Sequence, residues 1–149
     1  MTTTHHVATL GRARRIPGPR ATRISIGEFY LVMAGINIGL VVGDSEVYRH
    51  FADRGLFPFV RDGWADIVMA APGVWIGLLA GGEISIGVAL VAGGRWTLPG
   101  YAAIVVFHLA LVLFGLGILT WSGPVLLLMS LVVRRELLAR RGTNAPAIT

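Results

Sequence analysis

The chain has 149 residues, of which 54% are hydrophobic and 14% are charged, and its formal net charge at pH 7 is +5. This composition is too apolar for an ordinary soluble domain and indicates an integral membrane protein. The sequence contains no cysteine, which excludes disulfides, thiolate metal sites and dithiol redox relays within this chain.

The N-terminal residues 1–22 are polar, contain Pro17 and Pro19 and carry four arginines. We expect them to form a disordered basic arm. Residues 140–149 are expected to form a second disordered tail. Because the positive charge gathers at the two ends, it indicates membrane orientation and attraction to anionic lipid, and we expect no binding of nucleic acid. We expect no metal site, and we assign no role to the adjacent His5 and His6.

Four apolar segments predict an all-α, integral membrane four-helix bundle within residues 23–139. The predicted spans are 24–42, 67–92, 101–121 and 123–139. A short turn that contains Arg95 joins the second and third spans, and a tight reversal at Ser122, Gly123 and Pro124 is expected to separate the third and fourth spans.

The polar connection between the first two spans predicts a short amphipathic helix. Ser45 and Gly55 are suitable caps, and Val47, Tyr48 and Phe51 have helical spacing between them. Arginines precede the first span, follow the fourth and occupy the short second turn, so the positive-inside rule places both termini in the cytoplasm. The amphipathic helix is then extracytoplasmic and lies on the membrane surface.

The fourth predicted span is unusual because Arg134 and Arg135 follow only ten uninterrupted apolar residues, 124–133. Two explanations remain open. Both arginines extend to the cytoplasmic headgroups, or one of them enters the bundle and forms an ion pair with Glu28 of the first span.

Two ionisable residues are expected near the middle of the membrane. Glu83 lies 12 residues before Arg95 and His108 lies 13 residues after it, which places both about 18–20 Å from the turn. Asn37 of the first span falls in nearly the same layer, and on its helix it points about 180° away from Glu28. A hydrogen bond between Glu83 and His108 is geometrically reasonable, since their helices are antiparallel neighbours.

Three interpretations of this polar layer remain open. Glu83, His108 and Asn37 form a neutral hydrogen-bonded layer that fixes helix register, or a protonated Glu83 exchanges its proton with His108 or a bound quinone-like head group. In the third interpretation His108 ligates haem, which would need a second histidine from another subunit. Glycines at helix-packing spacing are interpreted as packing surfaces, namely Gly35, Gly39, Gly73, Gly77 and Gly81.

Several short tracts resemble the DoxX-like family of small bacterial four-helix membrane proteins. They are residues 82–90 (GEISIGVAL), 94–96 (GRW), 108–111 (HLAL), 121–124 (WSGP) and the pair 134–135 (RR), and the resemblance covers about residues 24–135. It implies a glutamate in the second helix, which Glu83 matches, and a location in the bacterial inner membrane. It also implies association with redox systems, since relatives include the membrane subunit of thiosulfate:quinone oxidoreductase and a component of a mycobacterial oxidative-stress complex.

No autonomous catalytic constellation is visible in the sequence, and whether the chain is an enzyme is left open. Our main hypothesis is a membrane subunit or anchor associated with a quinone-linked redox system, with a redox partner subunit and quinone as a possible cofactor. The alternatives are a small carrier or proton pathway, or a structural accessory subunit of a larger membrane complex. In each case the partners are the lipid bilayer and an oligomer or larger assembly.

Overall fold

The computed structural model describes residues 18–143 of the chain, and the side chains of residues 18–138. It has four long helices: α1 (Pro19–Gly43), α4 (Pro72–Ala92), α5 (Thr97–Leu111) and α6 (Leu119–Thr143). The shorter elements, in chain order, are η1 (Ser45–Tyr48), α2 (His50–Asp53), α3 (Pro58–Gly63), η2 (Trp64–Val68), η3 (Gly94–Trp96), η4 (Val112–Phe114) and η5 (Leu116–Ile118). This described part of the chain contains no strand.

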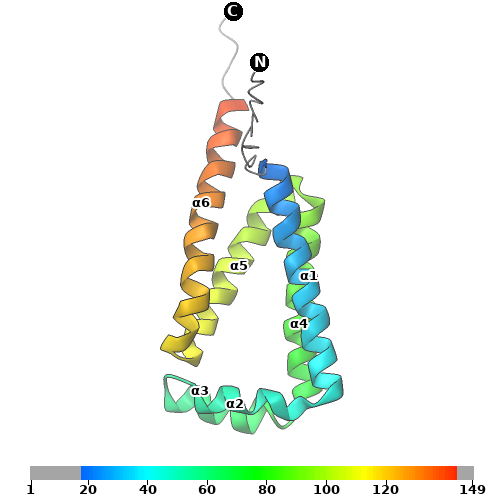
Figure 1. Ribbon diagram of the computed structural model, residues 1–149, viewed down its shortest axis with the longest axis vertical. Helices are drawn as coiled ribbons and strands as arrows, with labels where there is room; N and C mark the ends of the chain where they lie inside the picture. The colour runs from blue at the N-terminus through cyan, green and yellow to red at the C-terminus, as the bar shows by residue number, and fades with distance from the viewer. Residues whose placement is uncertain (1–17, 144–149) are drawn as a thin grey trace, which may run out of the picture.

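The four long helices form a bundle whose two ends differ in the elements that they contain (Figure 1). Helix α1 begins and α6 finishes at one end, which we call the terminal end, and η1, α2 and α3 lie across the opposite end. Four helical stretches are long and apolar enough to cross a membrane: Pro19–Gly43, Pro72–Ala92, Gly94–Phe114 and Leu116–Leu138. The predicted all-α four-helix membrane bundle is therefore confirmed.

Helices α1 and α4 pack closely because two glycines face each other. A Cβ atom on Gly27 would lie 2.9 Å from the carbonyl oxygen of Gly87, and one on Gly87 would lie 2.6 Å from Cγ of Leu31. No atom lies within 4 Å of a Cβ built on the five glycines that the sequence suggested as packing surfaces. The prediction that these five glycines are packing surfaces is therefore wrong for contacts within the chain. The buried face of α4 contains Ile76, Ala80 and Gly87 instead.

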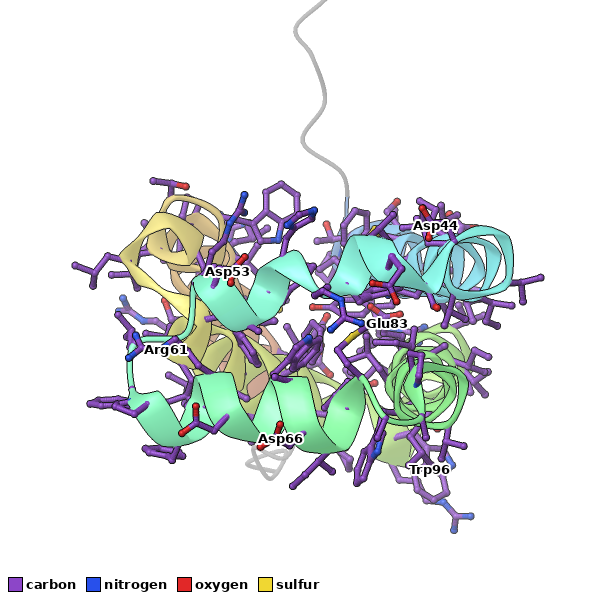
Figure 2. The ribbon with its side chains drawn as sticks, turned by 90° about the horizontal axis from the view of Figure 1, so that it is seen from below. Asp44, Asp53, Arg61, Asp66, Glu83 and Trp96 are labelled. Carbon is purple, nitrogen blue, oxygen red and sulfur yellow. The ribbon has the colours of Figure 1, made fainter. Side chains whose placement is uncertain are left out.

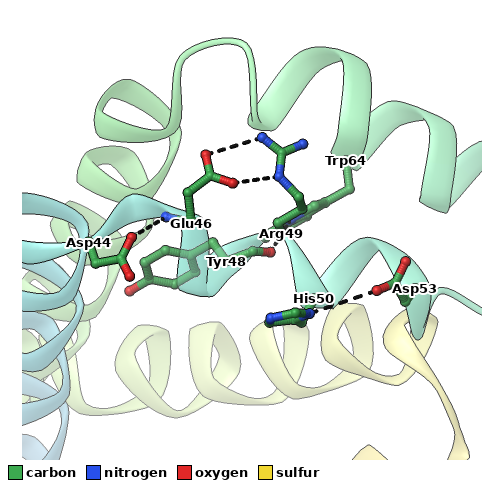
Figure 3. Close-up of polar contacts among 7 residues, drawn as sticks. All are labelled: Asp44, Glu46, Tyr48, Arg49, His50, Asp53 and Trp64. Carbon is green, nitrogen blue, oxygen red and sulfur yellow. Dashed lines mark hydrogen bonds and ion pairs between the residues drawn. The ribbon is translucent and has the colours of Figure 1, made fainter.

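Residues 45–68, here called the connecting segment, replace the single amphipathic helix that was predicted. Figure 2 shows η1 and α2 running across the end of the bundle, with α3 and η2 running back beside them. The Asp44 side chain accepts a hydrogen bond from the Glu46 backbone N–H, so Asp44 and not Ser45 is the N-cap (Figure 3). Arg49 forms an exposed ion pair with Glu46 at 2.6 Å.

The connecting segment is attached to the distant turn between α5 and α6. Its Leu56 N–H donates to the Leu113 carbonyl at 2.8 Å. The ring of Phe114 lies 4.9 Å from Trp64 and 6.3 Å from Phe51, measured between centroids. These contacts hold the segment in place across the bundle end.

The turn between the last two spans differs from the prediction. The sequence placed it at residues 122–124, but the structure places it at Gly115, whose φ is +116°. Only glycine adopts such a conformation readily. Pro124 lies inside α6, and membrane helices tolerate an internal proline because neighbouring groups can satisfy the freed carbonyl. The third span therefore ends at Phe114 and the fourth extends over Leu116–Leu138. The fourth span is long enough to cross a membrane although it contains Arg134 and Arg135 near its end.

Three other predicted boundaries shift for local reasons. Helix α1 begins at Pro19, which is favourable in a first turn, so residues 19–22 are helical and not part of a disordered arm. Helix α4 begins at Pro72 because Ile67 and Val68 belong to the π-helical turn η2. Helix α6 continues to Thr143 and includes residues 140–143 of the predicted tail. The rest of the predicted arm and tail, residues 1–17 and 144–149, lies outside the described residues.

Gly115→Ala is expected to destabilise the protein by about 1–3 kcal/mol, because alanine is strained at this φ. Its Cβ would also lie 2.8 Å from the carbonyl oxygen of Arg54. The measurement is the midpoint of thermal unfolding in detergent. Gly117→Ala is the control, since its Cβ would meet no atom within 4 Å. Equal losses in both variants would contradict this account of the turn.

Candidate functional site

A groove of about 660 Å³ lies between α4 and α5. This volume is in the usual range for sites that bind small molecules. The side chains that line it are almost all apolar, and they include Leu78, Leu79, Ile86, Ala89, Trp96, Ala103, Val106 and Phe107. Leu78 and Val106 are 63% and 66% exposed, so the groove opens sideways, toward the lipid tails that surround a membrane bundle.

Glu83 is the one ionisable residue that lines this groove. It lies 11 residues after Pro72, about 16–17 Å along α4 and near the middle of the span. Its side chain is only 3% exposed. No described residue forms an ion pair with it, and a carboxylate without a cationic partner is costly at this depth. Glu83 is therefore best suited to the neutral, protonated form.

Asn37 connects Glu83 to α1. Its side-chain Nδ2 donates to Oε2 of Glu83 at 2.8 Å, as expected for two residues predicted in one layer. Figure 2 shows Glu83 between the coils of α1 and α4. Glu28, on the same helix as Asn37, is exposed. Asn37 thus faces the bundle and Glu28 faces away, as their predicted separation of about 180° requires.

Tyr48 is a member of this site that the sequence did not identify. It belongs to η1 outside the spans, yet its hydroxyl donates to Oδ1 of Asn37 at 2.8 Å. Burial raises the pKa of the Tyr48 phenol above its usual value, so the hydroxyl keeps its proton and acts as the donor. The sequence showed Tyr48 only as an apolar position of an amphipathic helix, which gave no sign of this contact.

His108 belongs to a second polar cluster, between α1, α5 and α6. Its Nε2 lies 3.0 Å from the Tyr30 hydroxyl and its Nδ1 lies 3.0 Å from Oγ of Ser122. His108 and Ser122 are 2% and 0% exposed. The hydrogen bond expected between Glu83 and His108 is absent from the described structure, because each side chain forms hydrogen bonds with other residues. Sequence spacing predicted a common depth for these two residues but did not predict which neighbours their side chains reach.

Both ring nitrogens of His108 are used in this arrangement, which leaves neither of them for a haem iron. No group of three or more potential metal ligands occurs among residues 18–138. His108 thus suits a register-fixing role of neutral hydrogen bonds, but the single layer of Glu83, His108 and Asn37 in the first interpretation is divided into two clusters.

Ser122→Ala is expected to lower stability by about 1–2 kcal/mol, because it leaves Nδ1 of buried His108 without a partner. The matched control is Ser130→Ala on the same helix, whose exposed hydroxyl bonds only the carbonyl of Leu127. The free energy of unfolding in detergent should fall for the first variant and stay unchanged for the second. The opposite order would show that the cluster does not hold the helices together.

The ion pair considered between Glu28 and an arginine of the fourth span is not formed. Glu28, Arg134 and Arg135 are all exposed, and no ion pair within 4.0 Å joins them in the described chain. Because α6 is longer than predicted, both arginines lie about 22–24 Å along it from Leu119, where they can reach headgroups. At the terminal end, the guanidinium of Arg23 donates to the carbonyl oxygens of Leu90 and Val91 at the end of α4.

No protein-family model, curated protein or solved structure matches this chain.

Proposed function

We propose that the protein is a membrane subunit or anchor of a quinone-linked redox system, and that it binds a quinone-like head group in the groove between α4 and α5. The observation that carries the proposal is a laterally open, apolar groove with one buried carboxyl, that of Glu83, in its wall. The resemblance to DoxX-like proteins supports the same assignment, and this chain would then be one of that family.

The groove suits a flat, lipid-soluble molecule for physical reasons. Phe107 and Trp96 supply aromatic surface for a ring. Its open side lets a hydrocarbon tail remain among the lipids. Glu83 supplies the polar group that orients the ligand and a proton that it can donate.

A bound quinone supplies two-electron redox chemistry. The residues of this chain contribute binding, exclusion of water and a proton at Glu83. Because the chain has no cysteine, a dithiol that delivers electrons would belong to a partner protein. A partner subunit is therefore part of the proposal.

The proposed location is the inner membrane of a bacterium, with both termini in the cytoplasm. The distribution of arginines supports this orientation. Arg23 and Arg95 lie at the terminal end with Arg134 and Arg135, while the connecting segment has three arginines and four acidic residues. The connecting segment would then face the extracytoplasmic side.

Native mass spectrometry of protein extracted in mild detergent tests the proposal. We expect a stoichiometric quinone, a redox partner or both to remain bound. Gly82→Leu is the matched variant, because Gly82 lines the groove and a Cβ there meets no atom within 4 Å. It should remove the quinone and leave the fold intact. A protein without quinone or partner would contradict the proposal.

A second candidate is a structural accessory subunit. It is favoured by the open surface beside Gly35, Gly39, Gly73, Gly77 and Gly81, where a Cβ would meet no atom within 4 Å. Such surfaces allow close approach of another helix. Loss of complex assembly in Gly77→Leu, with no chemical change in Glu83→Gln, would favour this candidate over the first.

A further inference from the structure

The connecting segment contributes a residue to the intramembrane site, although it lies at the end of the bundle. Tyr48 is only 5% exposed. Its hydroxyl lies 2.8 Å from Oδ1 of Asn37 and 3.2 Å from the backbone carbonyl of Asn37. The hydroxyl has a single proton to donate, and the shorter contact places that proton on Oδ1.

Tyr48 is itself held firmly. Its backbone carbonyl accepts a hydrogen bond from Nε1 of Trp64 at 2.8 Å (Figure 3). Its ring stacks on Phe51, with 6.1 Å between the centroids. Trp64 in turn packs against Phe114 at the end of the third span. The position of the phenol is thus set by contacts that do not involve Asn37.

The hydrogen bond from Tyr48 to Asn37 determines which group of Asn37 faces Glu83. With Oδ1 of Asn37 occupied as an acceptor, Nδ2 turns to Glu83 and donates to Oε2 at 2.8 Å. A carboxyl oxygen that accepts a short N–H bond is poorly placed to carry the proton. A neutral Glu83 then carries its proton on Oε1, the oxygen to which Asn37 does not donate.

We propose that Tyr48 is a positioning residue that fixes the Asn37 amide, so that Glu83 presents an O–H donor to the groove and selects apolar ligands that carry a carbonyl acceptor. The claim that Glu83 selects ligands rests on the proposed function. The positioning role of Tyr48 does not rest on it, since it concerns the protein without a ligand.

Infrared difference spectroscopy of the ligand-free protein tests the role of Tyr48. The C=O band of protonated Glu83 is identified as the band that Glu83→Gln removes. Tyr48→Phe, which deletes only the hydroxyl, should shift this band. Tyr101→Phe is the control, because it removes a buried tyrosine hydroxyl from the terminal end of α5, and it should leave the band in place. An unchanged band in Tyr48→Phe, or no protonated band at neutral pH, would overturn the proposal.

Ligand selection is tested with 2-methyl-1,4-naphthoquinone and 2-methylnaphthalene, which share a ring system and differ in the carbonyl groups. One hydrogen bond from Glu83 should give the quinone an affinity about 5- to 10-fold higher than that of the hydrocarbon. In Tyr48→Phe the preference should fall to about 2-fold, because the Asn37 amide loses its fixed orientation. The Tyr101→Phe control should keep the full preference.

The outcomes separate the two proposals. If neither compound binds the natural protein, the proposed function fails, and the infrared experiment still decides the role of Tyr48. If both compounds bind the groove equally well, the site is real but the selection by an O–H donor is wrong.

Discussion

Gly87→Val is expected to cause one of the largest losses of stability of any single substitution in this chain. The side chain would have to occupy space already filled by Leu31 and by the backbone of Gly27, whose carbonyl oxygen lies 2.8 Å from the position of the new Cβ. Overpacking of this kind costs about 1–3 kcal/mol or more where the neighbour is backbone and cannot move aside. We expect α1 and α4 to separate and the purified protein to unfold at a much lower temperature.

The control for this prediction is Gly81→Val on the same helix. Its Cβ would meet no atom within 4 Å, and it brings the same change in helix propensity as the first variant. In a detergent that keeps the protein monomeric, the unfolding temperature of Gly81→Val should remain close to that of the natural protein. Similar losses in both variants would show that helix propensity, and not contact between α1 and α4, decides the result.

The largest functional effects are expected from substitutions of Glu83. Glu83→Leu removes the donor to the groove and the partner of Asn37, and should reduce naphthoquinone affinity by about 10-fold. Glu83→Gln should bind within about 2-fold of the natural protein, because an amide can accept from Asn37 and still donate to a carbonyl. The amide cannot release a proton at neutral pH, so quinone-coupled activity of the intact complex should be lost in both variants.

Binding and turnover must be measured on the same preparations for this prediction to be decisive. His108→Gln serves as the control, since His108 belongs to the other polar cluster and does not line the groove. Its affinity for the naphthoquinone should be unchanged. Full activity in Glu83→Gln would contradict a proton-donating role for this carboxyl.

Much of the fold follows from the sequence because long apolar helices are strongly constrained in a membrane. The common layer of Asn37 and Glu83 also follows, since depth depends on residue counts along a helix and the two side chains are hydrogen-bonded. The boundary between the third and fourth spans did not follow. Ser122, Gly123 and Pro124 have the composition of a turn, but the backbone reverses at Gly115, where the connecting segment packs closely against the chain.

It was harder to predict which residues bond to one another than to predict which residues belong to the site. The direction of a side chain around a helix fixes which neighbour it can reach, but it does not choose between neighbours at similar distance. Glu83 bonds Asn37 of α1, while His108 bonds Tyr30 and Ser122. The role of Tyr48 depends on how the connecting segment folds back over the bundle, and no local pattern in the sequence contains that information.

The most direct test of the account is photoaffinity labelling with an azidonaphthoquinone, followed by mapping of the labelled peptides. If the quinone binds at Glu83, labelling falls within residues 78–89 and 96–107, which contain the residues that line the groove, and it is lost in Gly82→Leu. Labelling spread over the lipid-facing surfaces of all four long helices, or labelling that is unchanged in Gly82→Leu, would contradict a binding site at Glu83.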